Sequence, residues 1–388
     1  MPETTQAADV VVIGGGAIGL SVAWRAAQHG MRVVVLDGGR VGGGTSYHAA
    51  GMLAPIAEAV AAEQPLLELG LRSAGMYPAF VDELLGAAGV DGIGFTCCGT
   101  LMVARDADEA EALERELALR LRFGLAVQRL RPSQARALEP ALATALRLAL
   151  HVPDDHAVDP RALTAALAAA VRAAGGELRE HCPAASIECS GGRVSGVRLG
   201  EDGLQRLSAP AVVIAAGAWS PRIAGVPDGA GVPVSPVKGQ ILRLHDPAGP
   251  GLLTRVVRMG PSYLVPRGDG RYVLGATQEE RGFDRTVTAG AAFELLRDAA
   301  ELVPGVSELV IDELSAGLRP GTPDNLPAIG PSPVDGLHWA TGHRRGGILL
   351  APATAELVVA GLAGEALPEH AQPFSPTRFQ RARVGSPA

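Results

Sequence analysis

The chain has 388 residues, which exceeds the size at which one hydrophobic core usually stops growing, so two domains are expected. Hydrophobic residues make up 47% of it and charged residues 19%, with 50 glycines, which is typical of a compact α/β enzyme and excludes a disordered or fibrous chain. The formal net charge of -7 comes without a block of basic residues, which argues against nucleic acid and an anionic membrane surface as partners.

The cysteines and the N-terminus indicate the compartment. Cys97, Cys98, Cys182 and Cys189 form no Cys-x-x-Cys pair and have no histidines at metal-ligand spacing, so we expect no metal site and buried free thiols. The first nine residues lack the basic stretch of a signal peptide, and no apolar run reaches the roughly eighteen residues that span a membrane. A cytoplasmic protein is therefore expected.

The first predicted element is a strand at residues 10–13, four consecutive β-branched residues typical of a parallel sheet buried on both faces. Gly14, Gly16 and Gly19 follow with G-x-G-x-x-G spacing, and residues 20–29 have helical character. This order predicts a dinucleotide-binding βαβ unit. Gly14 permits the tight turn, Gly16 lets the backbone approach the pyrophosphate, and Gly19 allows the helix to pack closely on the strand.

A second strand, residues 32–36, ends in Asp37, eighteen residues after Gly19. An acid near this spacing binds a free ribose hydroxyl, which favours NAD or FAD over NADP. The βαβ unit by itself therefore indicates a dinucleotide and leaves both cofactors open.

Scaffold elements fill the middle of the chain. Residues 107–122 and 161–174 predict amphipathic helices. Three strand-like segments follow, at residues 177–180, 185–189 and 194–199, the last two joined by a Gly191-Gly192 turn typical of a hairpin. Residues 211–216 are the next buried strand, so the nucleotide-binding sheet resumes after an insertion and its domain is expected to be discontinuous.

The last third of the chain changes pattern twice. From residue 233 to 311, short alternating segments separated by Gly and Pro predict an antiparallel sheet. Residues 330–364 return to strand, glycine loop and helix, with Gly-His-Arg-Arg-Gly-Gly at 342–347. This second loop offers backbone N–H groups to an anion or a polar ring edge, which suits a long flavin cofactor better than NAD.

Several segments carry a family resemblance. Besides the glycine fingerprint they are residues 43–55 (GGTSYHAAGMLAP), 236–240 (PVKGQ), 316–322 (AGLRPGT) and 342–352 (GHRRGGILLAP). Together they resemble the D-amino-acid oxidase superfamily of FAD-dependent oxidoreductases, and within it the glycine oxidases of thiamine biosynthesis. The resemblance covers nearly the whole chain in consistent order.

The resemblance implies an α/β fold of two domains, in which a Rossmann-like FAD-binding domain of the glutathione-reductase type carries an inserted antiparallel-sheet substrate domain. The FAD-binding domain would comprise residues 1–85, 150–232 and 320–378. The substrate domain would comprise residues 86–149 and 233–319, and residues 379–388 would form a tail. The resemblance also implies a homo-oligomer, commonly a tetramer.

The same resemblance implies which residues contact FAD. They are Gly14, Gly16, Ala17, Ile18, Gly19, Asp37, Gly38, Thr45, Ser46, Ala50, Gly51, Met52, Ala184, His343, Arg344, Arg345, Gly346, Gly347, Ile348 and Leu349. Some relatives attach the flavin through a cysteine near the C-terminal glycine loop. Here no cysteine follows Cys189, so FAD is expected to be non-covalent.

For the substrate, the resemblance implies that Arg319 clamps a carboxylate, with the hydroxyl of Tyr263 near it and Met52 as a wall. Arg345 matches a second basic group near the flavin and the substrate. Gln278 departs from the pattern, because glycine oxidases tend to carry an apolar methionine at this position. A polar group there leaves the size and polarity of the substrate open.

The implied reaction is oxidative deamination of glycine and other small amines or amino acids. The imine would hydrolyse to an oxo acid, glyoxylate from glycine, and ammonia, while O2 becomes H2O2 and the product feeds thiamine thiazole biosynthesis. Flavin needs the substrate's Cα–H aimed at N5 and a neutral amine, so no catalytic side-chain base is expected. The arginine fork would supply the orientation through two charge-assisted hydrogen bonds.

Other interpretations remain open. Arg319 could hold a loop through carbonyl groups, and Tyr263 could be a packed core residue. Lys238 could face the flavin and aid oxygen reduction, or form a structural ion pair. The enzyme could instead be a D-amino-acid or sarcosine-type oxidase or dehydrogenase with another substrate or electron acceptor. A flavin-bearing tRNA-modification protein is disfavoured because no basic patch is evident.

Overall fold

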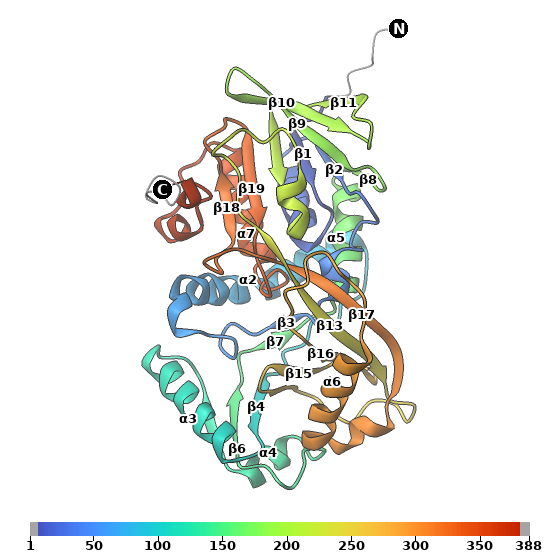
Figure 1. Ribbon diagram of the computed structural model, residues 1–388, viewed down its shortest axis with the longest axis vertical. Coiled ribbons are helices and arrows are strands. Elements are labelled where there is room, and N and C mark those ends of the chain that lie inside the picture. Colours follow the sequence, from blue (N-terminus) through green and yellow to red (C-terminus); the bar gives the residue numbers. More distant parts are fainter. Residues whose placement is uncertain (1–6, 381–388) are drawn as a thin grey trace.

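The computed structural model describes residues 7–380. A six-stranded and a three-stranded sheet form the upper half in Figure 1, and an eight-stranded sheet forms the lower half. A short antiparallel pair, β3 (Met52–Leu53) and β7 (His156–Ala157), lies between the halves.

The six-stranded sheet has the order β18-β19-β12-β1-β2-β8. Its strands are β1 (Val10–Ile13), β2 (Val33–Leu36), β8 (Glu177–Arg179), β12 (Ala211–Ile214), β18 (Ala328–Pro331) and β19 (Leu337–Thr341). Neighbours from β8 to β19 are parallel, and β18 joins the edge antiparallel. Three separate stretches of the chain thus build one sheet around β1.

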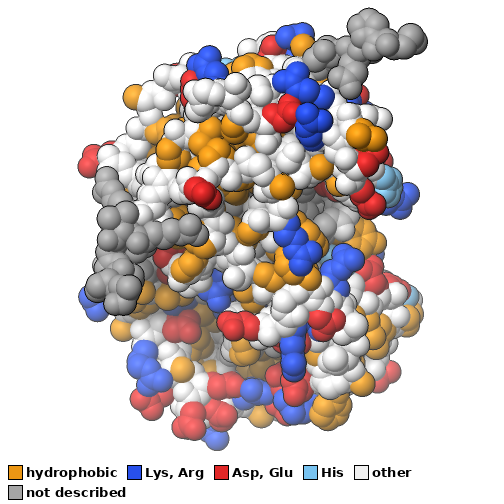
Figure 2. All heavy atoms as spheres, turned by 45° about the horizontal axis from the view of Figure 1, so that its top comes forward, with side chains coloured by type: hydrophobic (Ala, Val, Ile, Leu, Met, Phe, Trp, Pro, Cys, Tyr) orange, Lys and Arg blue, Asp and Glu red, His pale blue; other side chains and the backbone are white. Residues whose placement is uncertain are grey.

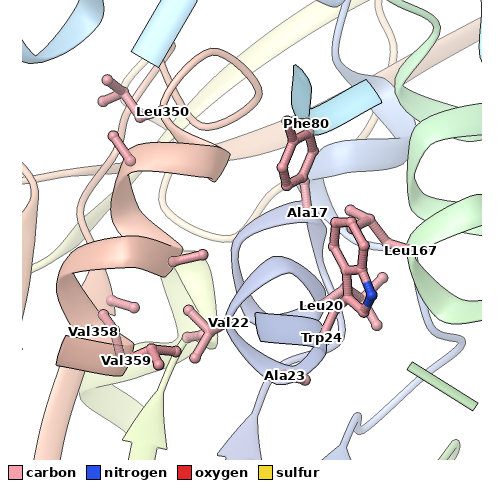
Figure 3. Close-up of a cluster of buried hydrophobic side chains, with 14 of the residues drawn as sticks. Ala17, Leu20, Val22, Ala23, Trp24, Phe80, Leu167, Leu350, Val358 and Val359 are labelled. Atoms are coloured by element: carbon pink, nitrogen blue, oxygen red, sulfur yellow. The ribbon is translucent and has the colours of Figure 1, made fainter. Parts of the chain in front are cut away.

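Helices cover one face of this sheet. They are α1 (Ala17–Gln28), α2 (Gln64–Ala88), α5 (Pro160–Ala173) and α7 (Ala351–Leu362). Figure 3 shows Trp24 of α1 between Phe80 of α2 and Leu167 of α5, and the ring centroids of Trp24 and Phe80 are 5.4 Å apart. Val10 and Val12 of β1 face this layer.

The three-stranded sheet covers the opposite face. It consists of β9 (Ala184–Ser190), β10 (Arg193–Leu199) and β11 (Gln205–Ser208), in the order β11-β10-β9. Val11 and Ile13 of β1 pack on this side. Alternate residues of β1 therefore enter two cores, which explains its unbroken run of β-branched residues. The Gly191-Gly192 turn joins β9 and β10 as predicted.

The eight-stranded sheet has the order β17-β13-β16-β15-β14-β4-β6-β5, and only β14 and β4 pair in parallel. Its strands are β4 (Thr100–Ala104), β5 (Gln128–Leu130), β6 (Leu148–Val152), β13 (Ser235–His245), β14 (Val256–Met259), β15 (Ser262–Pro266), β16 (Arg271–Gly275) and β17 (Val310–Gly321). The associated helices are α3 (Ala107–Arg122), α4 (Pro132–Leu138) and α6 (Ala289–Leu302).

Helix ends follow the local chemistry. Asp106 caps α3 by accepting a hydrogen bond from the backbone N–H of Glu109, and the helix matches the predicted range. Asp159 caps α5 in the same way, with Pro160 at the first helical position. Short 3₁₀ helices lie at Thr45–His48, Ala61–Glu63, Gly217–Arg222, Pro304–Glu308 and Glu369–Phe374.

Some expectations need correction. The cysteines are free but not fully buried, since Cys97 is exposed and the other three are partly exposed. The antiparallel region also contains α6, which the alternating pattern did not predict. Residues 381–388 of the predicted tail lie outside the described residues, and Phe379 packs against a core cluster. The domain boundaries stay a prediction.

On the face shown in Figure 2, basic and acidic side chains are interspersed over both halves of the molecule. Between residues 7 and 380, no helix combines the length and the apolar character needed to cross a membrane.

Candidate active site

A cavity of about 1340 Å³ extends from the carboxyl ends of β1 and β2 to the eight-stranded sheet. Doubly wound folds bind ligands at this edge of the sheet. The cavity is lined by the residues predicted to bind cofactor and substrate, with the exceptions of Gly19, Gly346 and Leu349. Gly346 and Leu349 line a smaller adjoining cavity of about 50 Å³. One continuous space therefore joins the two predicted sites.

The glycine loop after β1 is shaped by close backbone contacts. Gly14 has φ of 110°, and a β-carbon there would lie 2.3 Å from the carbonyl oxygen of Ala215. A β-carbon at Gly19 would lie 1.9 Å from the oxygen of Gly14, so Gly19 serves the packing of α1 on this loop. Helix α1 begins after Gly16, which offers no side chain to cap it. The positive end of the helix dipole is thus directed at the cavity.

Asp37, at the end of β2, is held by two backbone donors. Its Oδ2 accepts a hydrogen bond from Gly15 N at 2.8 Å, and its Oδ1 accepts one from Gly39 N at 2.8 Å. Each carboxylate oxygen keeps a second lone pair that a ribose hydroxyl can use. The acid is therefore oriented for the role that the sequence predicts.

The segment after β2 connects the two halves of the cavity. Ser46 Oγ accepts a hydrogen bond from Ala17 N at 3.0 Å, at the start of α1. Thr45 Oγ1 donates to Leu318 O at 2.6 Å, next to Arg319 on β17. Gly51 has φ of 79°, and a β-carbon there would lie 2.0 Å from Val158 O. This segment therefore fixes the glycine loop relative to Arg319.

The second glycine loop, residues 342–347, lies at the same cavity. Arg344 has φ of 47°, and its backbone N–H donates to Pro320 O at 2.8 Å, which ties the loop to the end of β17. His343 Nε2 lies 2.9 Å from Thr354 Oγ1 on α7, and burial lowers the pKa of His343 to about 3. The imidazole is therefore neutral and is held against α7.

Arg319 and Tyr263 meet at the far end of the cavity. Arg319 Nη1 donates to Thr277 O at 3.0 Å, so part of the guanidinium does hold a loop carbonyl, while the side chain also lines the cavity. Burial raises the pKa of Tyr263, and the charge and hydrogen bond of Arg319 oppose that shift. The phenol is therefore neutral, lies beside the arginine and also packs against a cluster of buried apolar residues.

The other predicted substrate residues occupy the same end of the cavity. Met52 belongs to β3, and Gln278 is exposed in the loop after β16. Arg345 lies between two acids, with Nε 3.9 Å from Glu58 Oε1 and Nη2 3.8 Å from Glu63 Oε2. These distances allow ion pairing but exceed those of hydrogen bonds.

Lys238 is not among the residues that line the cavity. Its buried Nζ donates to Asp284 Oδ2 at 3.0 Å and lies 3.7 Å from Glu279 Oε2. Of the two interpretations of this lysine, the geometry supports the structural ion pair.

Several charged residues of the cavity wall were missed from the sequence, and Arg258 and Glu58 are the two that lie nearest to Tyr263 and Arg345. Arg258 is on β14, directly opposite Tyr263 in the ladder, and its guanidinium donates to Ala57 O. Glu58 follows the Met52 segment. One signal could have identified it, because residues 41–57 contain no Asp, Glu, Lys or Arg and Glu58 ends that stretch. No comparable pattern marks Arg258.

Comparison with known proteins relates this arrangement to a family. The model of the FAD dependent oxidoreductase (DAO) family matches residues 9–360. A glycine oxidase of Geobacillus kaustophilus is 37% identical over 373 residues, which cover 95% of this chain and 97% of that protein. The crystal structure of glycine oxidase from Geobacillus kaustophilus superposes with a TM-score of 0.89 at 36% identity, covering 96% of this chain and 99% of that one.

A bifunctional ThiO/ThiG protein of Synechocystis is also similar. It is 34% identical over 382 residues, covering 96% of this chain. The match spans 54% of the bifunctional protein, so the chain corresponds to about half of it.

Proposed function

This chain belongs to the DAO family of FAD-dependent oxidoreductases, and on that premise we propose that it oxidatively deaminates glycine and other small amino acids. The product imine hydrolyses to an oxo acid and ammonia, and O2 accepts the electrons as H2O2. The observation that carries the proposal is the continuous cavity. It joins a glycine loop and an acid, Asp37, at one end to Arg319 and Tyr263 at the other.

The residues present fit FAD. The start of α1, Asp37 and the loop at 343–348 line one cavity, and the close contacts at Gly14 leave no room for a side chain there. We assign the adenosine ribose to Asp37 and the pyrophosphate to the start of α1. When bound, the flavin supplies the two-electron chemistry.

The protein's own part in the reaction is to bind and orient the substrate. Arg319 donates to the substrate carboxylate with the donors that Thr277 leaves free, and Tyr263 adds a hydroxyl. A carboxylate held at two points fixes the Cα–H direction, which converts binding into orientation. Lysine would provide a point charge without this geometry.

One observation favours a second candidate. Gln278 lines the substrate end of the cavity as a polar group. A D-amino-acid or sarcosine-type oxidase or dehydrogenase would use the same Arg319 clamp with a different substrate or acceptor. The two candidates differ in substrate preference and not in the clamp.

The proposal also covers the biological role, the compartment and the assembly of the protein. The similarity to a ThiO/ThiG protein supports a role in supplying thiamine thiazole biosynthesis. We further propose a cytoplasmic homo-oligomer with a discontinuous FAD domain (1–85, 150–232, 320–378) and a substrate domain (86–149, 233–319).

The test is a peroxide-release screen of the purified yellow protein with glycine, sarcosine and a panel of D- and L-amino acids. Peroxide from glycine at the highest kcat/KM supports the first candidate. A higher kcat/KM with another amino acid, or electron transfer to a dye but not to O2, supports the second. Failure of every amine with both acceptors would refute both.

A further inference from the structure

At the substrate end of the cavity, Glu58 places a carboxylate without a hydrogen-bond donor in the described part of the chain. Its side chain is 21% exposed, and its nearest recorded cation, Arg345 Nε, is 3.9 Å from Oε1. Across residues 7–380 no hydrogen bond to either carboxylate oxygen of Glu58 is found within 3.5 Å. A partly buried carboxylate without donors is costly, so a donor from a ligand would relieve that cost.

The backbone next to Glu58 is clamped on both sides. The carboxylate of Asp155 accepts hydrogen bonds from Ile56 N at 3.2 Å and Ala57 N at 2.9 Å. The buried guanidinium of Arg120 donates to the carbonyl oxygens of the same two residues, at 2.9 and 2.7 Å. Arg258 also donates to Ala57 O. Glu58 is therefore held in place by groups from three separate elements, and it does not sit on a free loop.

Three arginines lie near Glu58 in the cavity wall, and two acids, Asp155 and Glu63, also lie close to it. Arg319, Arg258 and Arg345 line the same cavity, and the charge of Glu58 is among those that act on the Tyr263 hydroxyl. Among the other acids that line the cavity, Glu279 is occupied by protein donors. Its Oε1 accepts hydrogen bonds from Thr277 Oγ1 and Gln240 Nε2, and its Oε2 faces Lys238. Glu58 is thus a fixed carboxylate in the cavity wall whose oxygens remain able to accept a hydrogen bond from a ligand N–H group.

We propose that Glu58 binds the amino group of the substrate while Arg319 binds its carboxylate, so that the site recognises both poles of an amino acid. This inference rests on the proposed function. A fixed carboxylate can accept a hydrogen bond from the neutral amine that the reaction requires, and it disfavours an acidic group at that point, because an acidic group would meet like charge. Glu58 then contributes to recognising amino acids over simple carboxylic acids.

The test compares two ligands that differ only in the amine. Glycine binding is read from KM and from the anaerobic rate of flavin reduction. Binding of acetate, which lacks the amine, is read as a Kd from the perturbed flavin absorbance. Glu58→Gln should raise the KM of glycine about tenfold or more and leave the Kd of acetate within threefold or lower it. Glu58→Asp, which retains the charge, should recover part of the glycine affinity.

Glu63→Gln is the matched control. Glu63 flanks Arg345 at 3.8 Å but lines the smaller cavity. The KM of the Glu63→Gln variant for glycine should stay within threefold of the wild-type value. Equal effects of the two Gln variants would mean that Glu58 acts only through Arg345, and equal changes for glycine and acetate would mean a general loss of the pocket. Either result overturns the proposal.

Measurements on the wild-type protein distinguish failure of the Glu58 contact from failure of the proposed function. If wild type releases peroxide from glycine and Glu58→Gln changes neither ligand, the amine contact is wrong and the proposed function stands. If wild type oxidises no amine, the proposed function fails by itself. If the Glu58→Gln variant loses its flavin, the Glu58→Asp variant tests the contact instead. Shortening the side chain would weaken a direct contact, so unchanged affinities for glycine and acetate in Glu58→Asp would contradict the proposal.

Discussion

The guanidinium of Arg319 lies against the backbone of Gly239, so closely that a β-carbon at Gly239 would stand 2.3 Å from Nη1. Gly239 pairs with Gly317 between β13 and β17, and Arg319 is two residues further along β17 on the same face. The position of the arginine thus depends on the absence of a side chain on the neighbouring strand.

Gly239→Ala should displace Arg319 without touching the cofactor end of the cavity. We expect kcat/KM for glycine to fall at least tenfold, about 1.4 kcal/mol of transition-state stabilisation, with flavin content unchanged. The control is Gly231→Ala, because a β-carbon at Gly231 meets nothing within 4 Å. A kcat/KM within threefold of wild type for Gly239→Ala would show that the arginine is not confined by this contact.

Removal of the clamp itself should be more severe. Arg319→Ala should lower kcat/KM for amino acids well beyond tenfold while the protein stays yellow, because the carboxylate loses its charge-assisted partner. Arg319→Lys should recover only part of the loss, since it lacks the planar fork. Steady-state peroxide release measures both variants. A loss of less than about tenfold in Arg319→Ala would contradict the assignment.

The sequence predicted the parts of the fold that have a strong local signature. Four β-branched residues and the glycine spacing located β1 and the loop before α1, and the amphipathic pattern of residues 107–122 located α3. The 25-residue helix α2 escaped prediction because Gly70, Gly75 and Pro78 interrupt its pattern. Its stability comes from packing, with Phe80 against Trp24.

The residues of the candidate site likewise fall into those with a local sequence signature and those without one. Arg319 and the two glycine loops lie in recognisable segments, Tyr263 was assigned through the resemblance, and all of them line one cavity. Arg258 and Glu58 belong to no such segment, and tertiary pairing alone brings them there. Arg258 reaches the wall because β14 pairs with β15, and Glu58 because Asp155 and Arg120 hold the preceding residues. Such long-range contacts leave no periodic trace in the sequence.

From the close packing at Gly19 we predict that a side chain there weakens the binding of the cofactor. Gly19→Ala would place a β-carbon 1.9 Å from Gly14 O, which forces α1 away from the glycine loop. We expect a lower ratio of flavin to protein absorbance and a lower Tm. Gly75→Ala in α2 is the control, since it meets nothing within 4 Å and should stabilise by up to about 1 kcal/mol. Full flavin occupancy in Gly19→Ala would contradict the packing role.

A variant that removes the ion pair of Lys238 distinguishes a structural role of this lysine from a role in oxygen reduction. Lys238→Met should leave Asp284 without its buried partner and lower the free energy of unfolding, by less than the loss of a fully buried pair would, because Asp284 is exposed to solvent. The rate constant of reduced flavin with O2, measured by stopped flow, should stay within twofold. A tenfold slower reoxidation would instead assign Lys238 to oxygen reduction.

Asp155 makes stability depend on pH. Burial raises the pKa of this carboxyl from 3.8 to about 7, against the opposing hydrogen bonds from Ala57 and Ile56. Between about pH 4 and 7 the folded chain therefore holds a proton that the unfolded chain has released. Stability falls as pH rises through this window, by up to about 1.4 kcal/mol per unit, and the loss is complete above it.

Asp155→Asn should remove this dependence. His48 and His343, whose pKa values burial lowers to about 4 and about 3, act in the opposite direction because the unfolded chain binds their protons first. The informative quantity is therefore the difference in unfolding free energy between Asp155→Asn and wild type, from urea titrations between pH 4.5 and 8. Relative to wild type, the unfolding free energy of the Asp155→Asn variant should increase as the pH rises to about 7 and then stay constant. A difference independent of pH would mean that Asp155 is ionised throughout, and that Arg120 and Arg258 offset its burial.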